Sequence, residues 1–193
     1  MAKPPIALLE SFASNSRATI SKDIPEEHLN QLLRFLERVG VSGHVPDYCN
    51  TEDFYSDLIG GILKPLTVLR GRITCLVSVK PAVTNKFGGF HGGAVAAVAE
   101  AVSFATARTV VAEDKELFLG ELSISYLSSA PKNFSSMAFQ NRTYLQAEVI
   151  IDGSVVRSGR NLTVVAQEFK LKKTGNLMYT ARATLYHMPV SKL

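Results

Sequence analysis

The sequence contains few cysteines and no concentrated block of charge. Cys49 and Cys75 are its only cysteines in 193 residues, and neither has neighbours at the spacing of metal ligands. We therefore expect two reduced thiols, no metal site and no cofactor. The 21 basic and 17 acidic residues leave a net charge of +4, with the basic residues scattered along the chain. This pattern argues against nucleic-acid binding, whereas it suits a small molecule that carries phosphates.

Long apolar runs are also missing. No uncharged apolar stretch approaches the roughly 20 residues that a membrane span needs. Residues 1–23 lack the continuous apolar segment of a signal peptide. We therefore expect a soluble intracellular protein that does not act at a membrane.

The last three residues form a targeting signal. Ser191, Lys192 and Leu193 give the tripeptide Ser-Lys-Leu, which the peroxisomal import receptor binds at a free carboxyl terminus. We expect this receptor to be a partner and the peroxisome to be the location of the protein.

The length and composition favour one main domain with an N-terminal extension. A chain of 193 residues, 46% hydrophobic and 20% charged, buries one good core but is too short for two. We assign residues 1–60 to a helical extension, residues 61–190 to the main domain and residues 191–193 to the targeting tripeptide.

The extension contains two predicted helices. Between Asp23 and Gly40, leucines recur at helical spacing, and Pro25 suits the first turn of a helix. We expect this leucine stripe to pack on the protein's own domain or on a second subunit. A shorter helix is predicted from Thr51, ending at Gly60.

The main domain alternates strands with one long helix. Residues 66–79 predict two short strands or one bent strand, and residues 92–111 predict a helix that is apolar on nearly all sides and therefore buried. Further strands are expected within residues 119–130, 144–151, 155–169 and 176–188, with a tight hairpin at Asp152-Gly153. The predicted fold is α+β, an antiparallel sheet wrapped around one central helix, and its outer face or edges need cover from another subunit.

One charged residue interrupts the apolar central helix. Glu100 is the only fully charged side chain between Lys86 and Arg108. A buried carboxylate costs several kcal/mol unless it is paired or protonated. Glu100 therefore either faces water, forms a structural ion pair or takes part in chemistry.

The start of this helix is suited to bind a developing negative charge. A helix N-terminus presents unpaired N–H groups and a partial positive charge, and glycines let a ligand approach the backbone closely. Thioester hydrolysis needs a polarised carbonyl and an activated water or carboxylate nucleophile. We therefore predict that the Gly92 N–H, alone or with that of Gly93, binds a thioester oxygen.

Two segments carry a family resemblance. The stretch "NKFGGFHGGAVAAVAEA" from Asn85, followed by "ISYLSSAP" from Ile124, resembles the hot-dog-fold acyl-coenzyme A thioesterases of the phenylacetate type. The resemblance covers residues 63–187. It implies a hydrolase of lipid metabolism that converts an aromatic or fatty acyl-CoA to the free acid and CoA. It also implies a homodimer or homotetramer. The sequence does not select the acyl group.

The resemblance assigns catalytic roles by position. The family's catalytic residues fall on Asn85, His91, Gly92 and Glu100. Glu100 corresponds to the general base or nucleophile, Asn85 orients the water or the thioester, and His91 positions the loop or the carbonyl. The resemblance further implies antiparallel central helices in a dimer, so that His91 and Asn85 of one subunit meet Glu100 of the other. A turn role for Asn85 and an ordinary structural role for His91 are the alternatives.

Coenzyme A contacts are implied on two further segments. The candidate residues are Tyr126, Ser128, Ser129 and Pro131 in the first, and Arg157, Ser158, Gly159 and Arg160 in the second. The two arginines are chemically suited to bind phosphates. A plain strand bulge at residues 158–160 is an equal alternative.

The sequence departs from the family at one position. Many relatives carry a serine or threonine on the strand after the central helix, where it helps to hold the nucleophilic water, and Leu119 or Gly120 falls there. Ser103, Ser123 and Ser125 are candidate replacements, although Ser123 needs a bulge to serve. Two alternatives to hydrolysis stay open: a non-catalytic acyl-CoA-binding or scaffold protein, and a hot-dog hydratase or dehydratase.

Overall fold

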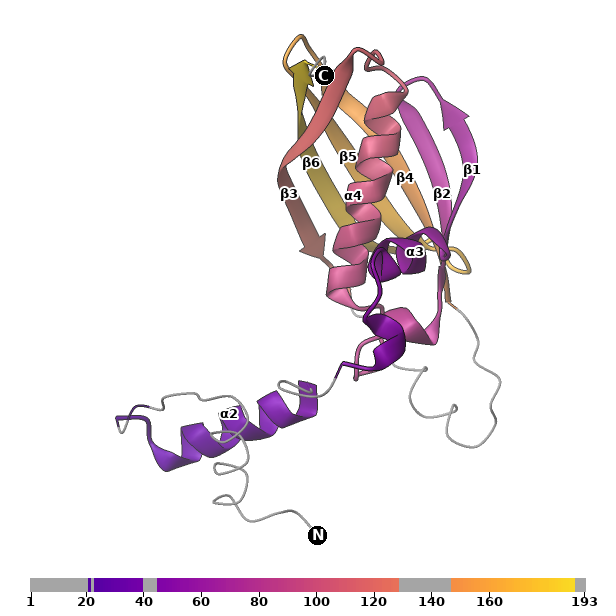
Figure 1. Cartoon of the computed structure of the whole chain (residues 1–193). Helices are drawn as coiled ribbons and strands as arrows, with labels where there is room; N and C mark the ends of the chain where they lie inside the picture. The colour runs from indigo at the N-terminus through magenta and orange to yellow at the C-terminus, as the bar shows by residue number, and fades with distance from the viewer. Residues whose placement is uncertain (1–20, 22, 40–44, 129–146, 190–193) are drawn as a thin grey trace. The chain divides into compact units, whose positions relative to one another are not determined.

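The computed structural model of the chain describes residues 21, 23–39, 45–128 and 147–189 (Figure 1). The targeting tripeptide and the candidate residues Ser129 and Pro131 lie outside these ranges. The chain divides into two units, residues 1–52 and 53–193. None of the described helices combines the length and the apolar composition that a membrane span requires.

The first unit contains the predicted amphipathic helix. Helix α2 comprises Glu26–Val39, and a short 3-10 helix, η1, comprises Asp47–Cys49. The acidic first turn and the basic last turn of α2 complement the helix dipole. Leu33 is buried, whereas Leu32 and Phe35 on the same helix are exposed.

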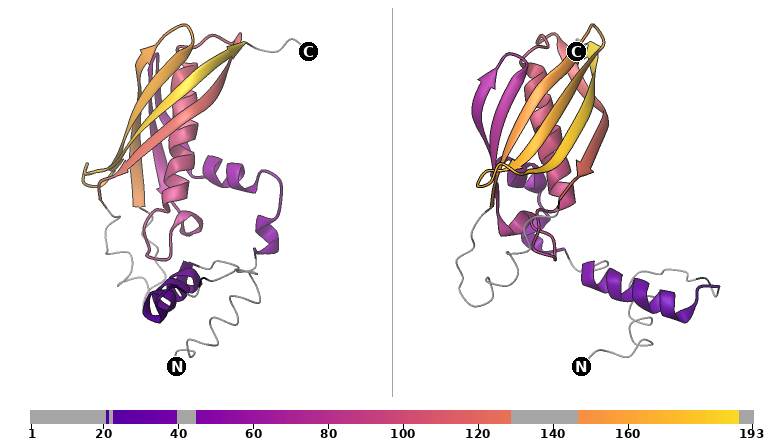
Figure 2. Two further views of the ribbon diagram at one scale, coloured as in Figure 1. Left: turned by 90° about the vertical axis from the view of Figure 1, so that its left-hand side faces the viewer. Right: turned by 180° about the vertical axis from the view of Figure 1, so that it is seen from behind.

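The second unit is built on one antiparallel sheet. Its six strands have the order β1-β2-β4-β5-β6-β3. They are β1 (Leu63–Leu69), β2 (Arg72–Val79), β3 (Lys115–Tyr126), β4 (Ala147–Ser158), β5 (Leu162–Leu171) and β6 (Leu177–Pro189). Helix α3 (Phe54–Gly60), the 3-10 helix η2 (Pro81–Val83) and the central helix α4 (Gly92–Arg108) complete the unit. The sheet curves around α4, which lies along one face (Figures 1 and 2). The predicted wrapped sheet is therefore confirmed.

Helix α4 forms the core together with the inner face of the sheet. The buried residues of the helix include Val95, Val98 and Val102, and they pack in one cluster with strand residues such as Ile151 and Phe169. Burying one valine contributes about 1.5–3 kcal/mol relative to leaving it exposed. Packing therefore outweighs the glycines at the helix start, each of which costs at most about 1 kcal/mol relative to alanine.

Asp152 and Gly153 do not form the predicted hairpin. Both lie inside β4, paired with β2 on one side and with β5 on the other. Gly153 faces α4, and a Cβ placed on it would lie 2.7 Å from Thr106 Oγ1 and 3.0 Å from Val102 Cγ1. The glycine therefore allows α4 to cross close to the sheet. The connection between β4 and β5 comes later, at residues 159–161.

Candidate active site

A short closed loop leads into α4. Thr84 and Phe90 form an isolated antiparallel bridge, and His91 N–H donates to Val83 O at 2.9 Å. Phe90 is buried at 5% exposure and anchors the loop in the core. The end of this loop therefore holds His91 at the start of the helix in a fixed position.

Asn85 shapes this loop with its side-chain oxygen. Asn85 Oδ1 accepts hydrogen bonds from Phe87 N–H and Gly89 N–H, both at 3.0 Å. The turn role considered for Asn85 is therefore present. Because both bonds use the oxygen, the side-chain NH₂ group stays available as a donor to a ligand.

His91 caps the N-terminus of α4. Its Nδ1 accepts a hydrogen bond from Gly93 N–H at 3.0 Å. In a neutral imidazole, an accepting Nδ1 leaves the proton on Nε2, so the exposed ring presents one donor outward. The Gly93 N–H is occupied and is therefore not the second oxyanion donor that the sequence suggested. The Gly92 N–H has no acceptor among the described residues.

Tyr126, at the end of β3, lies against the same helix start. Its hydroxyl donates to Gly92 O at 3.0 Å. A Cβ placed on Gly92 would lie 3.4 Å from this hydroxyl oxygen. The structure thus brings Tyr126 together with Gly92 and, through the cap, with His91. Ser128 is exposed two residues further along.

Tyr126 also contacts a buried tyrosine. Its ring meets that of Tyr179 edge to face, with centroids 5.4 Å apart. Burial raises the pKa of Tyr179, and the nearby Tyr126 phenol raises it further. Tyr179 thus stays neutral and acts as an apolar support for the Tyr126 ring.

Glu100 lies on the exposed side of α4. It lies nine positions after His91 in the sequence, which corresponds to about 13 Å of helical rise. A single helix therefore does not bring the carboxylate to the Gly92 N–H. Near Glu100, Ala96, Ala97, Ala101 and Phe104 are partly exposed and Ala105 is exposed, so all of these neighbours except Phe104 are small.

The second set of candidate residues lies at the opposite end of the sheet. Tyr126 pairs with Tyr179 at one end of β6, whereas Tyr186 near its other end pairs with Leu162, the first residue of β5. Arg157, Ser158, Gly159 and Arg160 belong to that second end and are exposed. One chain therefore holds two separate groups of candidate residues, one at each end of α4.

Residues 157–160 end one strand and begin a turn. The register shift in β4 falls between Val155 and Arg157, before the segment for which a bulge was considered. Ser158 pairs with Thr163, and Gly159 N–H donates to Leu162 O at 2.9 Å. A hydrogen-bonded turn, rather than a bulge, therefore presents Arg160.

The candidate replacement hydroxyls do not reach Glu100. Ser103 is fully buried on the sheet-facing side of α4. Ser123 and Ser125 are exposed and alternate with Leu122 and Ile124, which pack against the core, so they lie on the outer face of the sheet. The β3 register shift at Gly120 does not bring Ser123 inward.

Gln167 is a buried polar residue that the sequence analysis missed. It is 2% exposed on β5, and its Nε2 donates to Ala99 O at 2.7 Å and to Ser103 Oγ. Its Oε1 has no hydrogen-bond partner in the described structure. The alternation of Thr163, Val165, Gln167 and Phe169 along β5 is the signal that places Gln167 on the inner face.

No described residues suggest a metal centre, because nowhere in the described ranges do three or more His, Cys, Asp or Glu side chains gather closely enough to hold an ion. Cys49 and Cys75 are both free thiols, and burial raises the pKa of the Cys75 thiol.

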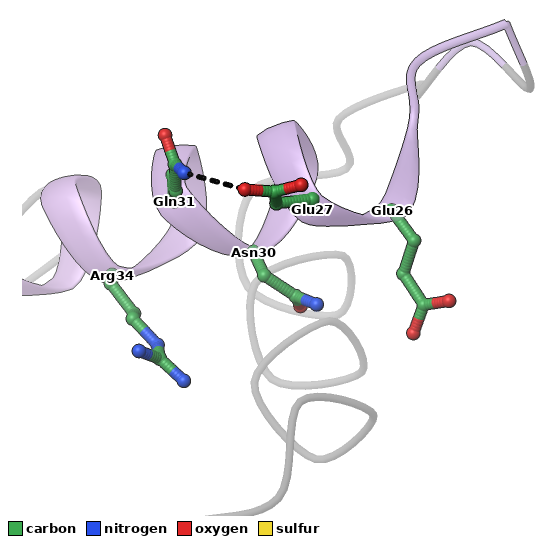
Figure 3. Close-up of a pocket in the computed structure, with 5 residues that line it drawn as sticks. All are labelled: Glu26, Glu27, Asn30, Gln31 and Arg34. Atoms are coloured by element: carbon green, nitrogen blue, oxygen red, sulfur yellow. Dashed lines mark hydrogen bonds between the residues drawn. The ribbon is translucent and has the colours of Figure 1, made fainter.

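A surface pocket on α2 is unrelated to the candidate residues. It is lined by Glu26, Glu27, Asn30, Gln31 and Arg34 (Figure 3). Gln31 Nε2 donates to Glu27 Oε1 at 3.5 Å across it. All of these side chains come from one face of one helix, and none belongs to the predicted site.

Solved thioesterase structures have a similar fold. Zebrafish thioesterase superfamily member 2 has 19% identity and a TM-score of 0.58, and the match covers 72% of this chain and 89% of that protein. A thioesterase from Haemophilus influenzae has 18% identity and a TM-score of 0.59, covering 89% of this chain and 95% of that protein. A thioesterase family protein from Silicibacter pomeroyi has 20% identity and a TM-score of 0.56, covering 71% of this chain and 94% of that protein.

Sequence comparison adds no closer relative. No protein-family model matches the chain, and no curated protein matches it significantly. The structural likeness shows the fold: this chain has the hot-dog fold that the sequence predicted.

Proposed function

We propose that this chain is an acyl-CoA thioesterase that hydrolyses an aromatic or fatty acyl-CoA to the free acid and CoA. The observation that carries the proposal is the start of α4, where the Gly92 N–H is unpaired beside the capping His91 and the Tyr126 hydroxyl. The thioester oxygen accepts the Gly92 N–H as negative charge develops on it. One well-aimed donor of this kind lowers the activation barrier by about 3–4 kcal/mol.

His91 and Asn85 support this donor. The Nε2–H of neutral His91 is free to approach the same carbonyl, because Nδ1 is held by Gly93 N–H. The Asn85 NH₂ group is free to orient the attacking water, because Oδ1 is held by the loop. Each side chain thus has one atom fixed by the backbone and one directed to substrate, which favours a preorganised site.

Glu100 acts from a second copy of the chain. Two α4 helices that run antiparallel bring Glu100 of one copy toward Gly92 of the other. Ala96, Ala97 and Ala101 allow a close approach beside Glu100, and the partly exposed Phe104 adds apolar contact one turn further along. There Glu100 removes a proton from a water molecule, whose oxygen attacks the carbonyl carbon, and the carbon–sulfur bond breaks to release the acid. In the alternative route Glu100 attacks the carbonyl carbon directly and displaces the thiolate, and a water molecule then hydrolyses the resulting mixed anhydride to the acid and restores Glu100. In both routes the CoA thiolate leaves and takes up a proton. In the same antiparallel dimer, Arg157 and Arg160 of one copy lie near the helix start of the other copy, where they bind phosphates of CoA.

One observation favours a second candidate, an acyl-CoA-binding protein without turnover. The core-facing residues of β3 include Leu117, Leu119, Leu122 and Ile124, so no serine or threonine there holds the water. Such a protein would bind acyl-CoA through the same phosphate contacts without hydrolysing the thioester.

Free-thiol release from a panel of aromatic and fatty acyl-CoAs tests the proposal. We expect turnover in the full chain and a loss of roughly 100-fold or more in Glu100→Gln, with a smaller loss in Asn85→Ala. Glu121→Gln, which changes an exposed glutamate on β3, is the matched control and should retain turnover. Binding of CoA without thiol release from any substrate would instead support the binding protein.

A further inference from the structure

A chain of hydrogen bonds links Ser158 to His187 near the last turn of α4. Ser158 Oγ lies 2.8 Å from Thr163 Oγ1, and Thr163 Oγ1 lies 2.9 Å from His187 Nε2. His187 Nδ1 lies 3.2 Å from Arg160 O. Ser158 is exposed, Thr163 is fully buried and His187 is partly buried. The chain therefore connects the surface to a titratable ring through a hydroxyl that water does not reach.

The Arg160 carbonyl at the far end of the chain of bonds fixes their direction. Arg160 O only accepts, so His187 Nδ1 carries a proton. When the ring is neutral, Nε2 is then an acceptor, so Thr163 donates to Nε2 and Ser158 donates to Thr163. The single proton of Ser158 points inward, and its oxygen offers only lone pairs to a ligand.

Protonation of His187 reverses the chain without breaking any bond. Nε2 becomes a donor to Thr163, Thr163 donates to Ser158, and the Ser158 proton turns outward. When His187 is protonated, Ser158 therefore offers its proton to an anion. When His187 is neutral, the Ser158 oxygen offers only lone pairs, which an anion does not bind.

The charges around this chain are mostly positive. Lys115 lies on the same face of β3 as Leu117, the register partner of His187, so it is a diagonal neighbour of His187. Arg108, at the end of α4, donates to Lys115 O at 2.6 Å. Arg160 follows Ser158 in the turn, whereas Arg157, which pairs with Val164, lies on the opposite face of β4 from Ser158. Within the described ranges, none of these four cations forms a salt bridge.

The nearby acidic groups do not balance these cations. Glu113 and Asp114 are exposed in the connection before β3, and Glu116 points to the opposite face of that strand from His187. On β5 and β6, the register neighbours of His187 are uncharged. A bound dianion at Ser158 would supply the missing negative charge and favour the imidazolium form.

We propose that Ser158 and the surrounding cations bind a phosphate group of coenzyme A, and that this binding is coupled to protonation of His187 through Thr163. The inference rests on the proposed function for the identity of the ligand. His187 acts through the hydroxyl chain and does not touch the phosphate. CoA binding therefore takes up a proton from solution, and the affinity for CoA falls as pH rises.

Calorimetric titration of the full chain with CoA measures this proton directly. Titrations at pH 7 in buffers of different ionisation enthalpy give the number of protons taken up. We expect uptake of up to one proton more in the wild type than in His187→Gln, and an affinity that falls by up to about tenfold per pH unit in the wild type only. Because the ligand is the same, its own phosphate ionisation cancels in this difference.

Two further variants make the result specific. Ser158→Ala should bind CoA more weakly and lose the extra uptake while keeping His187. His28→Gln, an exposed histidine on α2, is the matched control and should keep the extra uptake. Should His187→Gln fold poorly, the His187 ring resonance in wild-type NMR spectra serves instead, since CoA should shift its titration to higher pH. No such shift would contradict the proposal.

The outcomes separate this inference from the proposed function. Tight CoA binding with equal proton uptake in wild type and His187→Gln would overturn the coupling and leave the thioesterase proposal intact. No CoA binding would count against the thioesterase proposal, and the same titration with inorganic pyrophosphate would then decide on the site. Proton uptake on pyrophosphate binding that is lost in His187→Gln would support the phosphate site. Absence of pyrophosphate binding would overturn it.

Discussion

Replacing Gly153 with alanine tests how closely the central helix approaches the sheet. The added Cβ would meet Thr106 Oγ1 at 2.7 Å and Val102 Cγ1 at 3.0 Å, and both side chains are fully buried on α4. Thr106 Oγ1 is also fixed by a hydrogen bond to Val102 O at 2.7 Å. Relief therefore requires the helix to move or Thr106 to leave its rotamer, and overpacking of this kind costs about 1–3 kcal/mol.

Thermal unfolding followed by circular dichroism measures this cost. For a unit of this size, 1 kcal/mol corresponds to roughly 3–4 °C, so Gly153→Ala should lower Tm by about 3–12 °C. Gly60→Ala is the matched control, because a Cβ there meets nothing within 4 Å, and its Tm should be unchanged or slightly raised. A Gly153→Ala protein as stable as the wild type would refute the close helix crossing.

Three further outcomes are expected. Tyr126→Phe removes the hydrogen bond to Gly92 O and should lower kcat about 2–10-fold in the thiol-release assay with little change in Tm; an unchanged kcat would separate Tyr126 from the oxyanion donor. Gln167→Met should lower the free energy of unfolding in urea by about 1–2 kcal/mol. The double variant Gln167→Met/Ser103→Ala should recover part of this loss, because removing both partners leaves no buried hydroxyl unpaired. Simple additivity of the two single changes would argue against the bond. Burial raises the pKa of Cys75 above its ordinary value of 9.0. The unfolded state therefore loses the thiol proton at lower pH than the folded state, and the free energy of unfolding falls as pH rises above 9. In urea titrations between pH 8 and 10, Cys75→Ala should show a shallower decline of this free energy.

Most of the scaffold was predictable because local patterns and tertiary packing agree. The apolar run from Gly92 has the length and alanine content of a buried helix, and it is one. Pro25 marks a helix start for reasons of backbone geometry alone. The prediction failed at Asp152-Gly153, where the glycine serves the packing of α4 rather than a turn. A dipeptide carries no information about which helix will cross it.

The candidate site was predictable in part for a similar reason. His91 and Gly93 lie two residues apart in the sequence, so the cap that links them follows from local spacing. The bonds of Gln167 to Ala99 and of His187 to Thr163 join residues on different elements. Strand register decides these contacts, and register depends on the whole sheet.

The separation of His91 and Glu100 along α4 has a consequence for mixtures of chains that carry different inactivating substitutions. If each working site takes His91 from one copy and Glu100 from the other, His91→Ala and Glu100→Gln damage different halves of it. An equal mixture of the two variants, dissociated and reassociated, forms hybrids in half of the dimers, and each hybrid has one complete site. Activity should therefore return to about a quarter of the wild-type value, although each variant alone stays inactive.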